Sequence, residues 1–555
     1  VQDARRGALP EALVAYLPTI GRPNAIEASD ILIESGTVAL ATQDPFELPL
    51  KPTWQEDPYG DPTWIYEYQS LFIVLDALLA HRATAEGKYL ELAALHLDRW
   101  LAVHMDGGFH AHWGDHVTAN RARVLLWAWE LLRERDPDSE TVDSLCRQLA
   151  LHANHLSNEF EYSENHNHGF FQDEALLALA LALEDHPRHS DWLELAKERL
   201  AKQVDYAVTS EGVHREHSPS YHAGMQQRFI SLRGLLAELG LELQVNLSEI
   251  VESMYEFMTY GVLPTGQAPL LGDSSSWFGS VSDSAISETA KYSLSGGSSG
   301  TMPSGVDRVF PQSGYAFFRD AWHGADTFDQ TVYVAFVAAL FSRAHKHGDD
   351  LSVLLYGYGE QWLIDSGFWN YDPKDPYYKL SVSPAGHNVV EVDGKDYFQS
   401  YPNERRADSS FQLITDYRLG TSSSRVQGEH RLNPGVLFER ELEYTRPANL
   451  IVSDRLTGED GESHDYVLYW HIAAGKTVTE TGPSSYLVRA AEPGPIMELT
   501  VQASASLQCE VITGSTAPYQ GWHFPAFLER VPAPVIACLQ RGRDADFETT
   551  IILRP

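Results

Sequence analysis

The sequence predicts a multidomain α + β fold, with an all-helical part followed by an all-β part. Up to about residue 270, apolar residues recur every three or four positions, which is the spacing of amphipathic helices. Beyond residue 305 the apolar runs are short, rich in β-branched residues and separated by turn residues, as in antiparallel strands. Helices first and strands after them indicate two separate domains.

The first region contains a series of amphipathic segments joined by short polar connections. Short connections place consecutive helices side by side, so a stack of antiparallel helix pairs is expected. A Ser- and Gly-rich stretch then predicts a linker or a long connecting loop. The clearest predicted helices are 88–104, 121–135, 142–157, 173–185 and 247–261. The predicted organisation is a helical domain over 1–272, a linker or loop over 273–305 and a β domain over 306–555.

The composition describes a folded, acidic protein. The 555 residues include 41 Lys+Arg against 77 Asp+Glu, which gives a net charge of −36. Nucleic-acid binding requires a basic face to neutralise phosphates, so we expect no nucleic-acid partner. Hydrophobic residues make up 43% of the chain, enough for a sizeable core. No apolar run reaches the roughly 18 residues of a membrane-spanning helix, so no membrane partner is expected.

Cysteine content and the first residues bear on the compartment. Cys146, Cys509 and Cys538 are too few for a disulfide framework, and we expect three buried thiols with no assigned role. The first residues lack the apolar stretch of a signal peptide, but the chain begins with Val, so a leader could have been removed. A periplasmic or secreted protein is expected if it was, and a cytoplasmic one otherwise. The oligomeric state stays open.

Two polar clusters lie in the helical half. Residues 164–169 read Glu-Asn-His-Asn-His-Gly directly before a helix expected to begin near Gln172. Amides and imidazoles at a helix N-terminus suit an anion, although a polar capping loop is an equal interpretation. Residues 214–222 place Tyr221 among three His and Arg215. Because a free Tyr has a pKa near ~10, a Tyr base needs cationic neighbours, and this cluster offers them. A surface loop is the alternative.

A third cluster lies in the β half. His345 and His347 alternate, so on a strand they would share a face. Asp365 and His387 follow within neighbouring predicted strands. Two imidazoles and one carboxylate form a plausible zinc site with room for a water. A hydrogen-bonded polar trio between strands is the alternative interpretation.

Taken in order, these clusters resemble the heparinase II/III superfamily of polysaccharide lyases, alginate lyase relatives included. The resemblance spans roughly residues 60–400 and rests on the joint order of short motifs. It implies an incomplete (α/α) toroid followed by an antiparallel β-sandwich. It also implies β-elimination on a polysaccharide that contains uronic acid. The motifs are Asn-His-Gly, His-x-x-His-Ser-Pro-x-Tyr-His, His-x-His-Gly-Asp, Asp-Ser-Gly and Gly-His-Asn.

The resemblance also implies roles for individual residues. Asn167 and His168 would neutralise the substrate carboxylate, Tyr221 would act as base, acid or both, and His345 would assist in proton transfer. A zinc ion of structural role, or another divalent ion, would be held by His347, Asp365 and His387. The residues expected to contact substrate are His116, Arg121, Arg123, Arg215, His222, Arg343, Trp369 and Tyr371.

The substrate expected from the resemblance is an anionic polysaccharide, and the charge of the chain opposes it. A protein at −36 repels a polyanion at long range, although salt screens charges beyond about 8 Å. The site must therefore be locally positive. Besides the four arginines already named, Lys346, Arg405 and Arg406 could contribute to such a patch. Heparan sulfate, chondroitin and hyaluronan are expected ahead of alginate.

Two further function classes stay open. A glycoside hydrolase on a helical toroid would use two carboxylates facing the cleft, and Asp173, Glu174 and Glu216 are candidates. A non-catalytic carbohydrate-binding protein would use the His pairs only to brace loops. A tyrosine set among three histidines favours catalysis over binding alone, and the candidate carboxylates have more His and Asn around them than a hydrolase mechanism needs.

Overall fold

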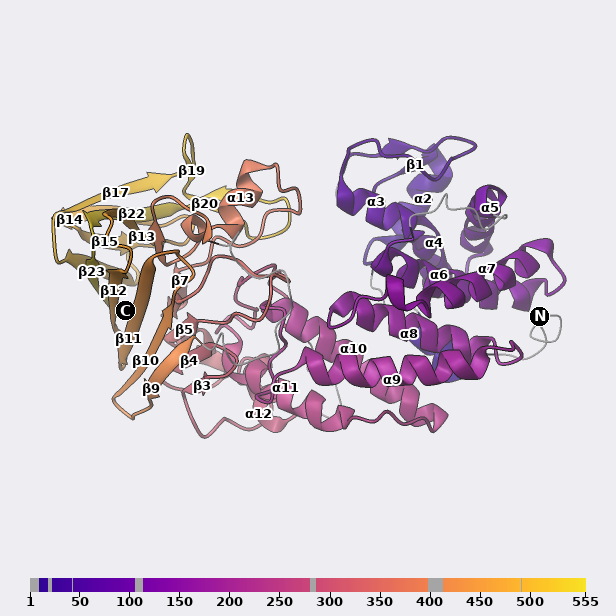
Figure 1. Cartoon of the computed structure of the whole chain (residues 1–555), viewed down its shortest axis with the longest axis horizontal. Helices are drawn as coiled ribbons and strands as arrows, with labels where there is room; N and C mark the ends of the chain where they lie inside the picture. The colour runs from indigo at the N-terminus through magenta and orange to yellow at the C-terminus, as the bar shows by residue number, and fades with distance from the viewer. Residues whose placement is uncertain are drawn as a thin grey trace. The chain divides into compact units, whose positions relative to one another are not determined.

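The structure is a computed structural model in which the chain forms two compact units (Figure 1). Unit 1 consists of Val1–Ala207 and Phe229–Leu247, and unit 2 consists of Val208–Arg228 and Ser248–Pro555. Arg405 and Arg406 lie outside the described residues. The structure describes residues 9–17, 22–41, 43–104, 113–279, 286–397, 413–490 and 492–555.

Unit 1 is built from helices, with one small pair of strands, β1 (Thr37–Val38) and β2 (Phe46–Glu47). Helix α10 (Pro219–Leu239) begins in unit 2, and from Phe229 its residues belong to unit 1. The other helices are α1 (Glu11–Tyr16), α2 (Ala25–Ser35), α3 (Pro62–Gln69), α4 (Phe72–Thr84), α5 (Gly87–His104), α6 (Asp115–Arg135), α7 (Glu140–Leu156), η1 (Glu159–Glu161), α8 (Asn167–Ala182) and α9 (His189–Ala207).

The helices predicted from periodicity are confirmed, and consecutive helices pack against each other as expected. Contacts join α4 to α5, α6 to α7 and α8 to α9. Helix α7 buries one stripe that includes Leu145, Leu149 and Leu156, the pattern of a helix with one face on the core. Its N-cap, Ser139, accepts a hydrogen bond from Val142 N at 3.2 Å. Helix α6 is buried on nearly all sides between Thr118 and Arg133.

The predicted start of α8 near Gln172 is wrong, because the helix begins at Asn167. His166 is the N-cap, and its Nδ1 accepts a hydrogen bond from His168 N at 3.0 Å. An imidazole replaces the hydroxyl, carboxylate or amide that usually caps a helix, so the sequence lacks the usual start signal. The consequence is that Asn167 and His168 lie in the first helical turn.

Unit 2 contains α11 (Leu247–Gly261, assigned to this unit from Ser248), α12 (Glu288–Leu294), α13 (Pro376–Val382) and two short helices, η2 (Ala325–Gln330) and η3 (Pro384–Gly386). Helix α12 lies within the Ser- and Gly-rich stretch, and Ser287 caps it by accepting from Ala290 N at 3.2 Å. Its Tyr292 packs with Trp322 and Phe328. The stretch thus includes an ordered, packed element.

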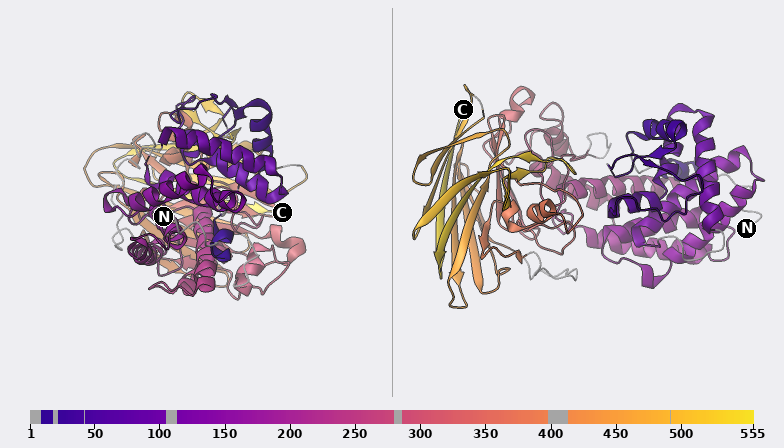
Figure 2. Two further views of the ribbon diagram at one scale, coloured as in Figure 1. Left: turned by 90° about the vertical axis from the view of Figure 1, so that its right-hand side faces the viewer. Right: turned by 90° about the horizontal axis from the view of Figure 1, so that it is seen from above.

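Three antiparallel sheets form the β part of unit 2 (Figure 2). The first contains, in order, β3 (Arg308–Phe310), β4 (Tyr315–Arg319), β5 (Tyr333–Val337), β6 (Ser352–Gly357) and β7 (Glu360–Leu363). The second has the order β17 (Leu507–Thr513), β22 (Pro534–Gly542), β13 (His464–His471), β8 (Val390–Val392). The third has the order β14 (Thr477–Gly482), β15 (Ser485–Arg489), β16 (Ile496–Ala503), β23 (Ala545–Arg554), β12 (Asn449–Gly458), β11 (Val436–Thr445), β10 (Ser423–His430), β9 (Ile414–Arg418). Two-stranded pairs join β18 (Ser515–Thr516) to β19 (Tyr519–Gln520) and β20 (Trp522–His523) to β21 (Val531–Pro532).

One apolar core lies between these sheets. In β11, Phe438, Arg440 and Leu442 are buried while Glu439 and Glu441 between them are more exposed, the two-residue period of a sheet with one covered face. They belong to one cluster with Phe336 of the first sheet and with Leu468 and Trp470 of the second. Face-to-face packing of antiparallel sheets around a shared core is a β-sandwich, so this part of the predicted fold class is confirmed. None of the described helices combines the length and hydropathy that crossing a bilayer would require.

The expectation of three cysteine thiols is wrong for two of them. Cys509 of β17 and Cys538 of β22 are directly opposed in register and form a disulfide. Their Cα atoms are 4.1 Å apart. The sequence shows neither the pairing nor the register of these strands, so it could not bring the two cysteines together. Cys146 is buried in α7 outside this bond.

We expect thiol counting to distinguish the three cysteines. Unfolded, unreduced protein should react with a thiol reagent at Cys146 alone, because the other two sulfurs are bonded to each other. After reduction all three should react. The matched control is Cys146→Ser, which should show no reactive thiol before reduction. Three reactive thiols in the unreduced wild type would contradict the disulfide.

Candidate active site and metal site

Tyr221 and His345, two of the residues predicted for catalysis, are in contact in unit 2. Their rings stack with centroids 3.7 Å apart and an interplanar angle of 24°. The hydroxyl of Tyr221 lies 3.4 Å from the hydroxyl of Tyr371, a predicted substrate contact that is 41% exposed. A phenol, an imidazole and a second phenol therefore converge, and each of these groups can carry a proton.

The His-Ser-Pro part of the second motif fixes the position of Tyr221. Helix α10 begins at Pro219, where the missing N–H costs no helical hydrogen bond. Ser218 Oγ accepts from Tyr221 N at 3.2 Å and contacts Ser274 Oγ at 2.7 Å. His217 Nε2 accepts a hydrogen bond from Phe341 N at 2.8 Å, and His217 Nδ1 lies 2.9 Å from Ala344 O. Burial lowers the pKa of His217 to about 3, so its imidazole is neutral and serves both bonds.

Asp273, which the sequence interpretation missed, lies between the two histidines of the third motif. Its Oδ2 is 2.8 Å from His345 Nδ1, and its Oδ1 is 2.9 Å from His347 Nε2. The side chain is 9% exposed. Burial alone would raise the pKa of Asp273, but the two imidazoles outweigh it and the pKa is lowered. Its position in a Ser-rich stretch hid it, since composition there predicted only a linker.

The two histidines come together for a different reason than expected. Alternation on a strand was predicted to place them on one face, but residues 341–350 form turns and His345 has a φ of +53°. The shared carboxylate of Asp273, rather than strand geometry, joins them. Burial lowers the pKa of His345, yet Asp273 and then Glu216 outweigh it, so the pKa is raised above 6.5. Glu216 Oε2 lies 3.5 Å from His345 Nε2.

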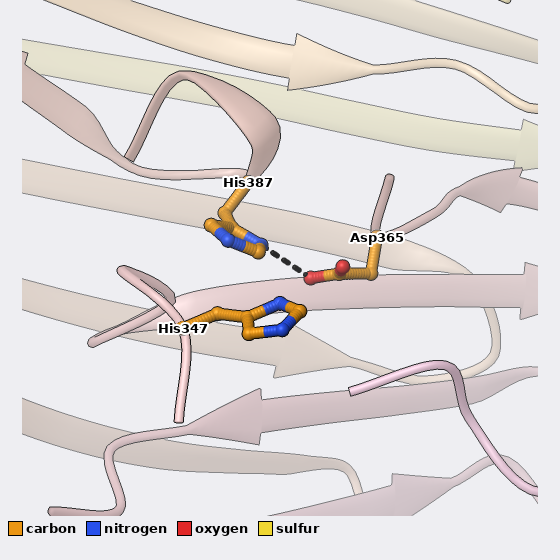
Figure 3. Close-up of side chains that lie close together, drawn as sticks. All are labelled: His347, Asp365 and His387. Atoms are coloured by element: carbon orange, nitrogen blue, oxygen red, sulfur yellow. Dashed lines mark hydrogen bonds and ion pairs between the residues drawn. The ribbon is translucent and has the colours of Figure 1, made fainter. Parts of the chain in front are cut away.

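His347, Asp365 and His387 meet in unit 2, as predicted for the metal site (Figure 3). One ligand atom from each lies within 4.8 Å of the others, and all three residues are buried. His387 Nδ1 is 2.7 Å from Asp365 Oδ2, the contact drawn dashed in Figure 3. His387 Nε2 is buried and has no hydrogen-bond partner among the described residues. Two imidazoles, a carboxylate and an unsatisfied buried nitrogen fit a zinc ion.

Unit 1 holds a second polar cluster around His168. Its Nδ1 lies 3.0 Å from Asp115 Oδ2, which also accepts a short hydrogen bond from Ser163 Oγ. The His168 side chain is 35% exposed, and Asn167 beside it is 5% exposed. The ring of His116, a predicted substrate contact, lies 4.5 Å from that of His168. Burial would raise the pKa of Asp115, but its hydrogen bonds and the charge of His168 lower it.

The structure does not support the predicted substrate contacts of Arg121 and Arg123. Arg121 is fully buried and donates to Gln69 O at 3.0 Å and His152 Nε2 at 3.1 Å. Arg123 is 2% exposed and lies 3.3 Å from Glu174 of α8. The family resemblance placed this helix facing the substrate, but both arginines pair with polar groups within the helical core.

His222 and Trp369 are also buried rather than positioned for substrate. His222 contacts Met254 O through Nε2 at 3.0 Å, and burial lowers its pKa to about 4. Trp369 donates from Nε1 to Asp375 Oδ2 at 2.7 Å and packs with Leu380 and Phe524. His222 is the last residue of the second motif and Trp369 follows the Asp-Ser-Gly motif, so their places in the sequence suggested a substrate contact that their burial does not support.

The remaining predicted contacts lie nearer to open space in unit 2. Arg343 lines a cavity of about 760 Å³ together with Tyr378, Lys379, Glu391 and Tyr519. Arg215 lies with its guanidinium 5.2 Å above the ring of Phe341. Asp396 also lines this cavity, so two carboxylates match its two cationic side chains, and Arg343 and Lys379 are the groups there that can pair with an anionic sugar.

The carboxylates considered for a glycoside hydrolase do not form a pair facing solvent. Asp173 is fully buried and accepts from Tyr162 OH at 2.8 Å, and Glu174 is 1% exposed beside Arg123. Both belong to the packing of α8 within unit 1. Glu216, at 6% exposure, lies instead beside His345.

Replacing Arg123 by Met should destabilise the fold without changing substrate affinity. The change leaves the buried Glu174 carboxylate without its cation, which costs about 3–5 kcal/mol in the free energy of unfolding. Denaturant unfolding measures this loss. The double variant Arg123→Met/Glu174→Leu should recover part of it, because no buried charge remains. If Arg123→Met raised KM and left the free energy of unfolding unchanged, Arg123 would contact substrate after all.

Comparison with known protein families shows two adjoining matches over most of the chain. Residues 54–293 match the description "Heparinase II/III N-terminus", and residues 302–551 match "Heparinase II/III-like, C-terminal". A heparin-sulfate lyase from Bacteroides thetaiotaomicron is 23% identical over 239 residues, which is 38% of this chain. The matched stretch spans about a third, 34%, of that relative's length.

Solved structures show the same fold. A heparinase III structure superposes with a TM-score of 0.80 at 15% identity, covering 97% of this chain and 88% of that one. A mutant of heparan sulfate lyase HepC from Pedobacter heparinus gives 0.69 at 14% identity, with 100% and 87% covered. Chondroitin AC lyase from Streptomyces coelicolor A3 gives 0.53 at 12% identity, with 99% and 82% covered. The predicted toroid followed by a β-sandwich is confirmed, and the chain belongs to the heparinase II/III superfamily.

Proposed function

We propose that this chain is a polysaccharide lyase that cleaves a glycosaminoglycan by β-elimination and leaves an unsaturated uronide. The observation that carries the proposal is the stack of Tyr221 on His345, with the Tyr371 hydroxyl 3.4 Å from that of Tyr221. Proton transfer groups of this kind suit removal of a carbon-bound proton and protonation of a leaving oxygen. Membership of the heparinase II/III superfamily supports the same reaction.

The proposed reaction needs two kinds of group, one that stabilises negative charge and one that transfers protons. Removing the proton next to a carboxylate builds negative charge, which fixed hydrogen-bond donors must stabilise. The Asn167 amide and the His168 imidazole of unit 1 are proposed for that task. Tyr221 is proposed to take the proton, to return one to the departing glycosidic oxygen, or both, with His345 assisting. Each assignment follows the superfamily motif that the residue occupies.

The substrate class is proposed from relatives and from charge. The relatives named above are a heparin-sulfate lyase and a heparan sulfate lyase, and chondroitin AC lyase shares the fold. In unit 2, Arg343 and Lys379 place two cationic side chains at a cavity of about 760 Å³. Glu391 and Asp396 line the same cavity, so the two cationic side chains offer contacts for anionic groups without making the cavity net positive. Heparan sulfate is therefore the first substrate to test.

A zinc ion of structural role is proposed at His347, Asp365 and His387. Bound there, it would cross-link the turn that carries His347 to the segments that carry Asp365 and His387. The disulfide between Cys509 and Cys538 supports a periplasmic or secreted location, because disulfides persist in oxidising compartments.

Absorbance in the ultraviolet during incubation with polysaccharide tests the lyase proposal directly, because only elimination creates an absorbing unsaturated uronide. The panel contains heparan sulfate, heparin, chondroitin sulfate, hyaluronan and alginate. Wild type should produce a rise on at least one glycosaminoglycan. Tyr221→Phe should lower kcat by about 100- to 10,000-fold, the usual contribution of a general acid or base.

The control for this experiment is Tyr417→Phe, which removes a hydroxyl from a tyrosine of β9 that is 44% exposed. It should keep the wild-type rate. New reducing ends without ultraviolet absorbance would favour hydrolysis over elimination. A rise on alginate alone would keep the reaction and replace the substrate class.

Metal analysis tests the zinc proposal. Purified wild type should contain about one zinc per chain, and His387→Ala should lose nearly all of it, since one of three ligands is gone. The matched control is His464→Ala, which also removes a buried histidine between carboxylates, Asp393 and Asp460. Equal zinc in wild type and His387→Ala would contradict the site.

A further inference from the structure

We infer that Asp273 is a positioning residue, one carboxylate that orients both the proton-transfer imidazole of His345 and the metal-ligand imidazole of His347. The inference rests on the proposed function and deepens it. It assigns a role to a residue that belongs to none of the motifs on which that function is based. The two contacts, 2.8 Å to His345 Nδ1 and 2.9 Å to His347 Nε2, use different oxygens of the same carboxylate.

Each contact selects one nitrogen of an imidazole. A carboxylate accepts and does not donate, so His345 presents N–H at Nδ1 and His347 presents N–H at Nε2. The other nitrogens are then Nε2 of His345, which lies 3.5 Å from Glu216 Oε2, and Nδ1 of His347. In metal sites a carboxylate behind a histidine ligand fixes its tautomer and ring orientation in this way. Here the same carboxylate also fixes a second imidazole, which is stacked on Tyr221.

The backbone around Asp273 is built for this placement. Gly272 has a φ of +55°, and a Cβ there would lie 2.4 Å from His345 O and 3.0 Å from His217 O. Only glycine allows so close an approach to those carbonyl groups. Asp273 N donates to His345 O at 3.3 Å, and Ser218 Oγ donates to Asp273 O at 3.2 Å. Hydrogen bonds to the main chain of Asp273 therefore fix the position of its carboxylate.

Burial makes the arrangement selective. At 9% side-chain exposure, Asp273 has little water to replace a lost partner, so both imidazoles stay on it. A shift of His347 would therefore move the Asp273 carboxylate and, with it, the ring of His345. Proton transfer and metal retention are expected to depend on the same side chain.

Asp273→Asn tests the inference through two readouts, steady-state kinetics and zinc affinity measured by competition with a chelator. Asparagine keeps the shape but can accept at only one atom and presents N–H at the other. We expect kcat to fall by about 10- to 100-fold with KM little changed, and zinc affinity to fall by about 10- to 100-fold. The matched control is Asp393→Asn. It makes the same change in another carboxylate that contacts a histidine, His464 Nδ1 at 3.0 Å, away from the candidate site. It should change neither quantity.

A double variant separates positioning from general damage. If Asp273 acts on proton transfer through His345, adding Asp273→Asn to His345→Gln should lower kcat no further. It should still lower zinc affinity, while His345→Gln alone should retain zinc. The inference would be overturned if the double variant lost kcat by the product of the two single losses. It would also be overturned if Asp273→Asn raised KM and left kcat unchanged. So would wild-type zinc affinity in folded Asp273→Asn.

The inference stays testable if Asp273→Asn does not fold or if wild type is inactive. If Asp273→Asn fails to fold by circular dichroism, Asp273→Glu keeps the negative charge and takes its place in both measurements, with the same expected direction. If wild type shows no lyase activity on any polymer, the proposed function fails, and the zinc affinities still decide whether Asp273 positions His347. If wild type is active and the Asp273 variant binds zinc with normal affinity, the inference about Asp273 is rejected while the proposed function stands.

Discussion

The arrangement of the candidate site in unit 2 depends on one buried carboxylate held between two imidazoles. Three segments that are distant in sequence, around residues 217, 273 and 345, meet there. An ionised carboxylate away from water is costly unless its partners are present, so the segments around 273 and 345 must both be in place, and the segment around 217 bonds to the main chain of each. The ring of Tyr221 then lies on His345 as a result of that assembly.

The sequence predicted those features that depend on local periodicity or on a motif. Helices such as 88–104 follow from a covered face repeating every three to four residues, and strands such as β11 follow from a period of two. The motifs also grouped His347, Asp365 and His387 as one ligand set and assigned Tyr221 and His345 to one catalytic site, and the structure brings the members of each group together.

Features that depend on long-range placement were missed or misassigned. Arg121 and Arg123 look like a basic helix face, but only the fold shows that their partners lie inside unit 1. Asp273 has no periodic or motif signal, since its function comes from two side chains more than seventy residues away. The pairing of Cys509 with Cys538 depends on strand register, which short-range patterns do not encode.

The disulfide has a consequence for the segment between its two cysteines. The two cysteines lie 29 positions apart, and the excursion between them carries Phe524, whose N–H donates to Ser366 O at 2.7 Å directly beside Asp365. Cross-linking a loop of this size removes about 3–4 kcal/mol of chain entropy from the unfolded state. Cleavage of the peptide chain within the excursion would leave both halves covalently attached to adjacent strands. Because Phe524 lies near the middle of the excursion, a cut on either side of it would still leave the segment that holds Ser366 tied to one of the two strands.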